Sequence, residues 1–213
     1  YLMLLGWSPG DNKEKIDLPQ AVKKFSIKRI NKAGAAFSMD KLKWLNGQYI
    51  KEMDDVRLAL LVMPFLKEKG WDTKAVGKDL LGRQAGLASI VHLFKPRMST
   101  LADFLDWAGF IFNDDVSYDE GARTEHLSKN RTVEFDLLAQ RLGAIVDFNA
   151  ATAEEAFRSL VKELGIEAGT LVHPVRVALT GRAVGPGLFD TMAVLGQART
   201  IQRLRQTFTG DMK

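Results

Sequence analysis

Apolar residues recur at intervals of three and four from Asp40 to the end of the chain, which is the spacing of one face of an α-helix. A half-buried strand would instead alternate apolar and polar residues, and only residues 25–30 do so, over a short stretch. The sequence therefore predicts a mainly all-α fold. A helical main body begins near residue 54, and a small mixed α/β unit precedes it.

Capping residues and breakers place the individual helices. Ser38 and either Asp54 or Asp55 are positioned to cap helices, and the helix after Asp54 should kink at Pro64 and end near Gly70. Thr152 is predicted to cap a later helix, with Glu155 as its capping-box partner. Further helices are expected from Ser99 or Thr100 to Phe112 and over residues 132–142, 152–164, 172–179, 189–195 and 200–208.

Turn signals divide the chain into three parts. Ser8-Pro9-Gly10-Asp11 and Ala33-Gly34 separate the first 53 residues as a small unit. Polar and charged residues interrupt the apolar periodicity between residues 113 and 130. We therefore expect two packed helical subdomains, residues 54–120 and residues 121–213, after the N-terminal unit of residues 1–53.

The net charge of +4 is unevenly distributed. Residues 1–53 hold ten Lys and Arg against five Asp and Glu, residues 54–170 hold 14 against 19, and residues 171–213 hold six against two. Two basic ends that flank an acidic middle fit either two separate patches for a polyanion or chance variation among solvated faces.

No residue pattern of a catalytic or metal site occurs. The chain has no cysteine, and its three histidines lie in no metal-binding spacing. The glycine-rich segment 181–187 lacks the preceding strand and the following Lys-Ser/Thr of a phosphate-binding loop. The apolar run at residues 2–5 is too short for a signal peptide or a membrane span. We therefore expect no metal, no membrane and no autonomous enzyme, and the missing cysteines favour the cytoplasm.

Three segments carry a family resemblance, in order along the chain. They are YLMLLGWSPG at 1–10, AFSMDKLKWLNGQYI at 36–50, and HPVRVALTGR at 173–182 with GPGLF at 185–189. Together they resemble the C-terminal part of bacterial glutamyl-tRNA synthetases (glutamate–tRNA ligases), including the anticodon-binding domain. The first segment is similar to the one that follows the ATP-binding loop of that family, and the loop itself is absent from this sequence.

The resemblance implies a tRNA-binding piece of a synthetase. Residues 1–53 would be the remnant of a connecting domain that contacts the tRNA stem, and the two helical subdomains would bind the anticodon. The catalytic domain, with its ATP and Mg²⁺, would lie outside this chain, so the chain alone would hold no cofactor and would not aminoacylate. The expected partner is the glutamate-accepting tRNA, and the expected state is a monomer. A helical protein-interaction scaffold without activity remains the alternative, given the acidic middle.

The resemblance also assigns anticodon contacts to Arg97, Arg176, Gly185, Pro186 and Leu188. A Gly-Pro-Gly turn lets backbone approach a base closely, an apolar side chain offers a stacking face, and a guanidinium supplies a fork of donors. Arg97 occupies the place where the family tests the third anticodon base. The open alternative is that the two arginines pair with acids of the helical body.

Phosphate contacts are expected at the two basic ends, because a tRNA is a dense polyanion. The candidates are Lys41, Lys43 and Lys51 for the inner stem, and Arg199, Arg203 and Arg205 for the anticodon end.

Overall fold

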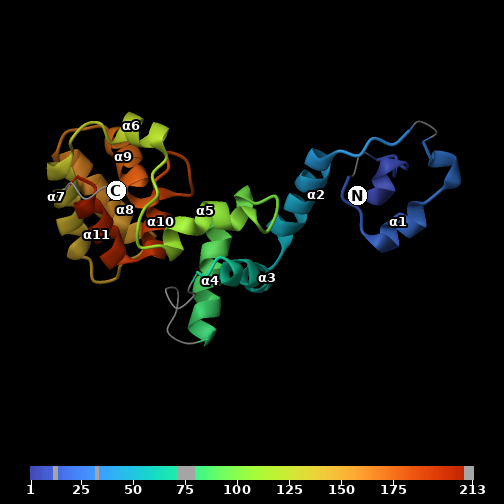
Figure 1. Cartoon of the computed structure of the whole chain (residues 1–213), viewed down its shortest axis with the longest axis horizontal. Coiled ribbons are helices and arrows are strands. Elements are labelled where there is room, and N and C mark those ends of the chain that lie inside the picture. The colour runs from blue at the N-terminus through green and yellow to red at the C-terminus, as the bar shows by residue number, and fades with distance from the viewer. Residues whose placement is uncertain (12–13, 32–33, 72–79, 209–213) are drawn as a thin grey trace.

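The computed structural model describes residues 1–11, 14–31, 34–71 and 80–208. Within these ranges the chain forms eleven α-helices and no β-strand, which confirms the all-α prediction. Figure 1 shows an elongated molecule, with an N-terminal group of short helices at one end, a middle group, and a compact C-terminal group at the other end.

The N-terminal group contains 3-10 helix η1 (Leu2–Leu5), α1 (Leu18–Lys24), 3-10 helix η2 (Ile27–Arg29) and α2 (Met39–Glu52). The middle group contains α3 (Asp55–Glu68), α4 (Leu80–Phe94), 3-10 helix η4 (Lys95–Arg97) and α5 (Asp103–Phe112). The C-terminal group contains α6 (Glu120–His126), α7 (Thr132–Gly143), α8 (Ala150–Glu163), α9 (Ala168–Thr180), α10 (Leu188–Leu195) and α11 (Gln197–Gln206).

The prediction of a strand at residues 25–30 is wrong. The segment folds into η2, in which the Arg29 N–H donates to the Ser26 carbonyl, and Ile30 forms only an isolated antiparallel bridge with Trp7. Trp7 is buried, and its ring lies 5.9 Å from that of Phe25. Local turn bonds, this bridge, one aromatic contact and a hydrogen bond from Arg29 Nη1 to the Pro9 carbonyl at 2.8 Å hold the segment.

Two helix starts agree with the capping analysis and two differ. Ser38 caps α2, and Asp54 caps α3 through the Arg57 N–H. Thr152 is not the cap of α8. Asn149 accepts hydrogen bonds at that end, and the Thr152 hydroxyl returns the contact as the third residue of a capping box. Asn is the stronger cap, so the helix begins earlier.

The helix expected from Ser99 or Thr100 begins three to four residues later, at Asp103. The Asp103 carboxylate reaches backward and accepts the N–H groups of Ser99 and Thr100 at 2.7 and 3.0 Å. Its side chain thus stabilises a turn ahead of α5, which keeps these residues out of the helix.

The buried side chains of the middle and C-terminal groups form one core cluster, which also includes Ile50 of α2. In the middle group the Phe94 and Phe104 rings pack edge to face, with their centroids 6.1 Å apart. In the C-terminal group Phe157 packs against Phe189 at 5.5 Å. Helix α10 contacts α4, so the two groups share packing.

A tight backbone junction positions the loop that follows α9. Gly181 ends the helix with φ +76°, and its carbonyl accepts the Asp119 N–H at 2.8 Å. An added Cβ at this position would lie 2.0 Å from the Ser117 carbonyl oxygen. Glycine is therefore required both for its left-handed backbone and for close approach to the 113–119 segment.

Candidate nucleic-acid interface

Two arginines from different groups meet at the loop between α9 and α10. Arg97, in η4, donates from Nη2 to the Gly185 carbonyl at 2.9 Å. Arg176, on α9, donates from Nη1 to the neighbouring Pro186 carbonyl. The structure therefore brings together four of the five residues proposed from the resemblance, although Arg97 and Gly185 are 88 positions apart in the sequence.

Backbone carbonyls, and no carboxylate of the described residues, accept the hydrogen bonds of the two guanidinium groups. Among the described residues neither arginine forms an ion pair with an acid of the bundle, and both donate to backbone carbonyls instead. Burial lowers the pKa of Arg176, and the positive charge of Arg97 lowers it further. Arg97 is exposed and uses one N–H on Gly185, which leaves further donors for a ligand.

Leu188 does not offer the stacking face expected of it. It is the first residue of α10 and is only 4% exposed, as part of the core. The spacing of the Gly-Pro-Gly turn could not show this, because the turn directs the side chain inward at the helix start. Leu188 can anchor the turn, and any base contact at this place would come from the turn's backbone.

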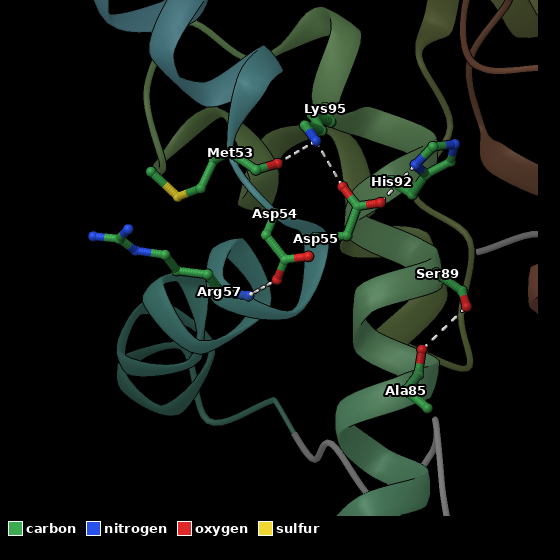
Figure 2. Close-up of polar contacts among 8 residues, drawn as sticks. All are labelled: Met53, Asp54, Asp55, Arg57, Ala85, Ser89, His92 and Lys95. Carbon is green, nitrogen blue, oxygen red and sulfur yellow. Dashed lines mark hydrogen bonds and ion pairs between the residues drawn. The ribbon is translucent and has the colours of Figure 1, made fainter.

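A hollow of about 440 Å³ lies beside Arg97, between α4 and α10. The residues that line it include His92, Pro96 and Arg97 on one side, and Pro186 and Asp190 on the other. His92 was not among the sequence candidates, because nothing in its neighbourhood marks it. Figure 2 shows its ring beside the carboxylate of Asp55, which lies 37 positions away in the sequence.

The basic residues proposed for phosphate contact fall into two kinds. Arg203 is only 4% exposed and donates to the carbonyls of Leu179, Phe110 and Asn113. The prediction that it contacts a tRNA phosphate is therefore wrong. Arg199 is half-buried and donates to the Ile111 carbonyl and to Asp114. Both arginines stabilise the junction of α5 and α11, and a helical spacing alone could not distinguish them from solvated cations.

The remaining candidates lie on the surface. Lys43, Lys51 and Arg205 are exposed, and Lys41 is half-buried and ion-paired with Glu14 at 2.7 Å. An exposed pair of this kind is worth at most about 1 kcal/mol, so a phosphate can compete for Lys41.

A larger hollow, of about 680 Å³, includes Trp107 and Arg182 in its lining. The Arg182 guanidinium lies 5.7 Å from the centre of the Trp107 ring. Asp106, Asp114 and Asp115 also line this hollow. These carboxylates repel a polyanion, so the cluster around Arg97 is the better candidate for nucleic acid.

Within the described ranges, no group of three or more His, Asp or Glu side chains could hold a metal ion. No helix in this part of the chain is long and apolar enough to cross a membrane.

The model of the family described as "anticodon binding domain" matches residues 57–208. The chain therefore belongs to the anticodon-binding-domain family, and the matched residues include Arg97, Arg176, Gly185 and Pro186. Similar curated proteins name a narrower class than the family model does, since they are glutamate–tRNA ligases. They confirm the resemblance to bacterial glutamyl-tRNA synthetases. Glutamate–tRNA ligase 1 of Caldanaerobacter subterraneus subsp. tengcongensis is 37% identical over 210 residues, which cover 97% of this chain and 42% of that protein.

Other relatives agree. Glutamate–tRNA ligase 2 of Thermoanaerobacter pseudethanolicus is 38% identical over 209 residues, 97% of this chain and 42% of that protein. The crystal structure of a glutamate tRNA ligase from Elizabethkingia meningosepticum in complex with its amino acid superposes with a TM-score of 0.85 at 29% identity, covering 99% of this chain and 40% of that one. The chain thus spans about 42% of the length of the curated relatives it matches.

Proposed function

We propose that this chain binds the anticodon loop of a glutamate-accepting tRNA, as part of a glutamate–tRNA ligase that joins glutamate to that tRNA. The observation that supports it is the pair Arg97 and Arg176, which carbonyls of one turn hold in place without neutralising their charge. An unpaired loop of RNA presents both phosphates and base edges to such a site. Its matched relatives are named glutamate–tRNA ligases.

The parts of the chain would divide this task. Residues 54–120 and 121–213 would hold the anticodon between them, since Arg97 and Arg176 come one from each. Residues 1–53, with Lys41, Lys43 and Lys51, would meet the inner stem. ATP and Mg²⁺ would bind in the portion of the relatives that this chain does not cover, and the protein would act as a cytoplasmic monomer.

The chain should bind glutamate tRNA with an affinity that falls as salt rises, because each phosphate contact releases counterions. Filter binding from 50 to 300 mM KCl measures this slope. A tRNA of the same length with an unrelated anticodon is the control and should bind more weakly. If the chain does not bind tRNA at the lowest salt, the alternative function, a helical protein-interaction scaffold, is favoured.

Changing Arg97 to Gln should narrow the preference for C over G at the third anticodon base. Cytosine presents acceptors at N3 and O2, and guanine presents donors at N1 and N2, so a group that only donates favours C. A lost charge-assisted contact is worth roughly 1 to 3 kcal/mol, which corresponds to about five- to 150-fold in the affinity ratio.

The measurement compares two tRNAs that differ only at that base, on the wild-type chain and on Arg97→Gln. Arg182→Gln is the matched control, since this arginine is exposed on the same loop but stacks on Trp107. An unchanged ratio in Arg97→Gln would make Arg97 a structural residue only.

A further inference from the structure

His92 is fixed in place by a carboxylate yet open to solvent. Its Nδ1 lies 2.8 Å from Asp55 Oδ2, while Lys95 Nζ lies 2.8 Å from the other oxygen, Oδ1, and also donates to the Met53 carbonyl. Figure 2 shows the lysine and the histidine approaching the carboxylate of Asp55 from its two sides. The His92 side chain is nevertheless 74% exposed.

The ionised carboxylate defines the orientation of the ring. Burial raises the pKa of Asp55, but hydrogen bonds from Lys95 and His92 outweigh it, so the pKa lies below the ordinary value of 3.8. An ionised carboxylate only accepts, so Nδ1 of His92 carries the proton that is shared with Asp55. The second ring nitrogen, Nε2, points away from Asp55 in Figure 2. It is a lone-pair acceptor in the neutral ring and a cationic donor in the protonated ring.

His92 lines the same hollow as Arg97. The charged groups that face it are Asp55 from α3, Lys95 and Arg97 from η4, and Asp190 from α10. Lys95 and Asp55 neutralise each other, which leaves Arg97 and Asp190 as the other charges of the hollow. Protonation of His92 therefore adds one positive charge beside Arg97.

We propose that His92 is a further RNA contact of this surface, which binds a backbone phosphate of the anticodon loop through Nε2, and that Asp55 is its positioning residue. This inference rests on the proposed tRNA binding. With Nδ1 donating to Asp55, only the protonated ring can also donate from Nε2, so this contact depends on protonation of the imidazole, whereas the guanidinium groups of Arg97 and Arg176 stay charged.

The test measures the affinity of the chain for glutamate tRNA, and its salt dependence, at pH 6.0 and pH 8.0. The wild-type chain should bind about three- to tenfold more tightly at pH 6.0, with a salt slope steeper by about 0.7 to 0.9, the value for one added phosphate contact. His92→Gln should lose both differences. His92→Lys should bind at pH 8.0 as tightly as the wild type does at pH 6.0, because its charge is permanent.

The other histidines supply the control, since the chain has three in all. His173 is exposed on α9 and stacks on His126 with the ring centroids 5.2 Å apart. His173→Gln should keep the full pH effect. Asp55→Asn, checked for folding by circular dichroism, should reduce it, because the ring loses its orienting acceptor.

The results separate this inference from the proposed function. Binding at pH 8.0 without a gain at pH 6.0, or a gain that disappears in His173→Gln but persists in His92→Gln, would overturn the role of His92 and leave tRNA binding standing. Absence of binding at both pH values would overturn the proposed function, and the role of His92 with it.

Discussion

Replacing Arg203 with Met should lower the free energy of unfolding by about 3 to 5 kcal/mol. The guanidinium is buried on α11 and donates to the carbonyls of Leu179, Phe110 and Asn113 at 2.7, 2.7 and 2.8 Å. These acceptors end α9 and α5 or follow them directly. Met fills most of the volume but supplies no donor, so three carbonyls lose their partner inside the protein, at about 1 to 3 kcal/mol for each that water cannot reach.

The lowered pKa of Arg203 shows how strongly its guanidinium is desolvated. Burial lowers its pKa to about 10, the nearby positive charge of Arg199 adds to the effect, and Tyr118 and Asp114 oppose it. The group remains protonated at neutral pH, so its hydrogen bonds persist under physiological conditions.

Urea denaturation followed by circular dichroism measures the effect. Arg205→Met is the matched control, because Arg205 is exposed on the same helix and its loss should change stability by less than about 0.5 kcal/mol. A stability of Arg203→Met equal to that of the control would show that the three carbonyls do not need this donor. Folded Arg203→Met protein should still bind tRNA, since the side chain does not reach the surface.

Changing Gly181 to Ala should destabilise the chain by about 3 to 4 kcal/mol. The left-handed backbone costs a side chain about 1 to 2 kcal/mol, and the new Cβ would overlap the Ser117 carbonyl, which is backbone and cannot rotate away. Relief requires a shift of the 113–119 segment, which would weaken the bond from the Asp119 N–H to the Gly181 carbonyl.

Gly165→Ala separates the two costs. Gly165 also has a positive φ, of +64°, but a Cβ there would meet nothing within 4 Å, so only the backbone cost of about 1 to 2 kcal/mol should appear. The difference between the two unfolding free energies then measures the steric overlap. Equal values for the two variants would mean that the 113–119 segment adapts without cost. Gly181→Ala should also weaken tRNA binding, because Gly181 begins the loop that carries Gly185.

Local chemistry made most of the fold predictable from the sequence. Asp54 and Ser38 cap the helices that follow them, since a short polar side chain before an apolar run satisfies the free N–H groups of the first turn. The same rule misplaced the start of α8, because Asn149 and Thr152 both fit it and only the backbone shows which residue caps first.

Burial and long-range contacts were not predictable in this way. The sequence does not distinguish the three arginines of α11 from one another. In the structure, however, Arg203 is buried, Arg199 is half-buried and Arg205 is exposed. Whether a long side chain turns inward depends on free carbonyls supplied by other helices, which sequence spacing does not reveal. The pair of His92 and Asp55 joins residues 37 positions apart, so no local pattern marks it.

The contact of Arg97 with the Gly185 carbonyl closes a separation of 88 positions, between η4 and the loop before α10. Because the two residues belong to separate groups of helices, the surface around Arg97 exists only when both groups are in place. A chain still being synthesised, with Arg97 released and Gly185 not yet made, presents the arginine without its acceptor. The surface around Arg97 therefore depends on a contact that a chain can make only once it has been synthesised through Gly185.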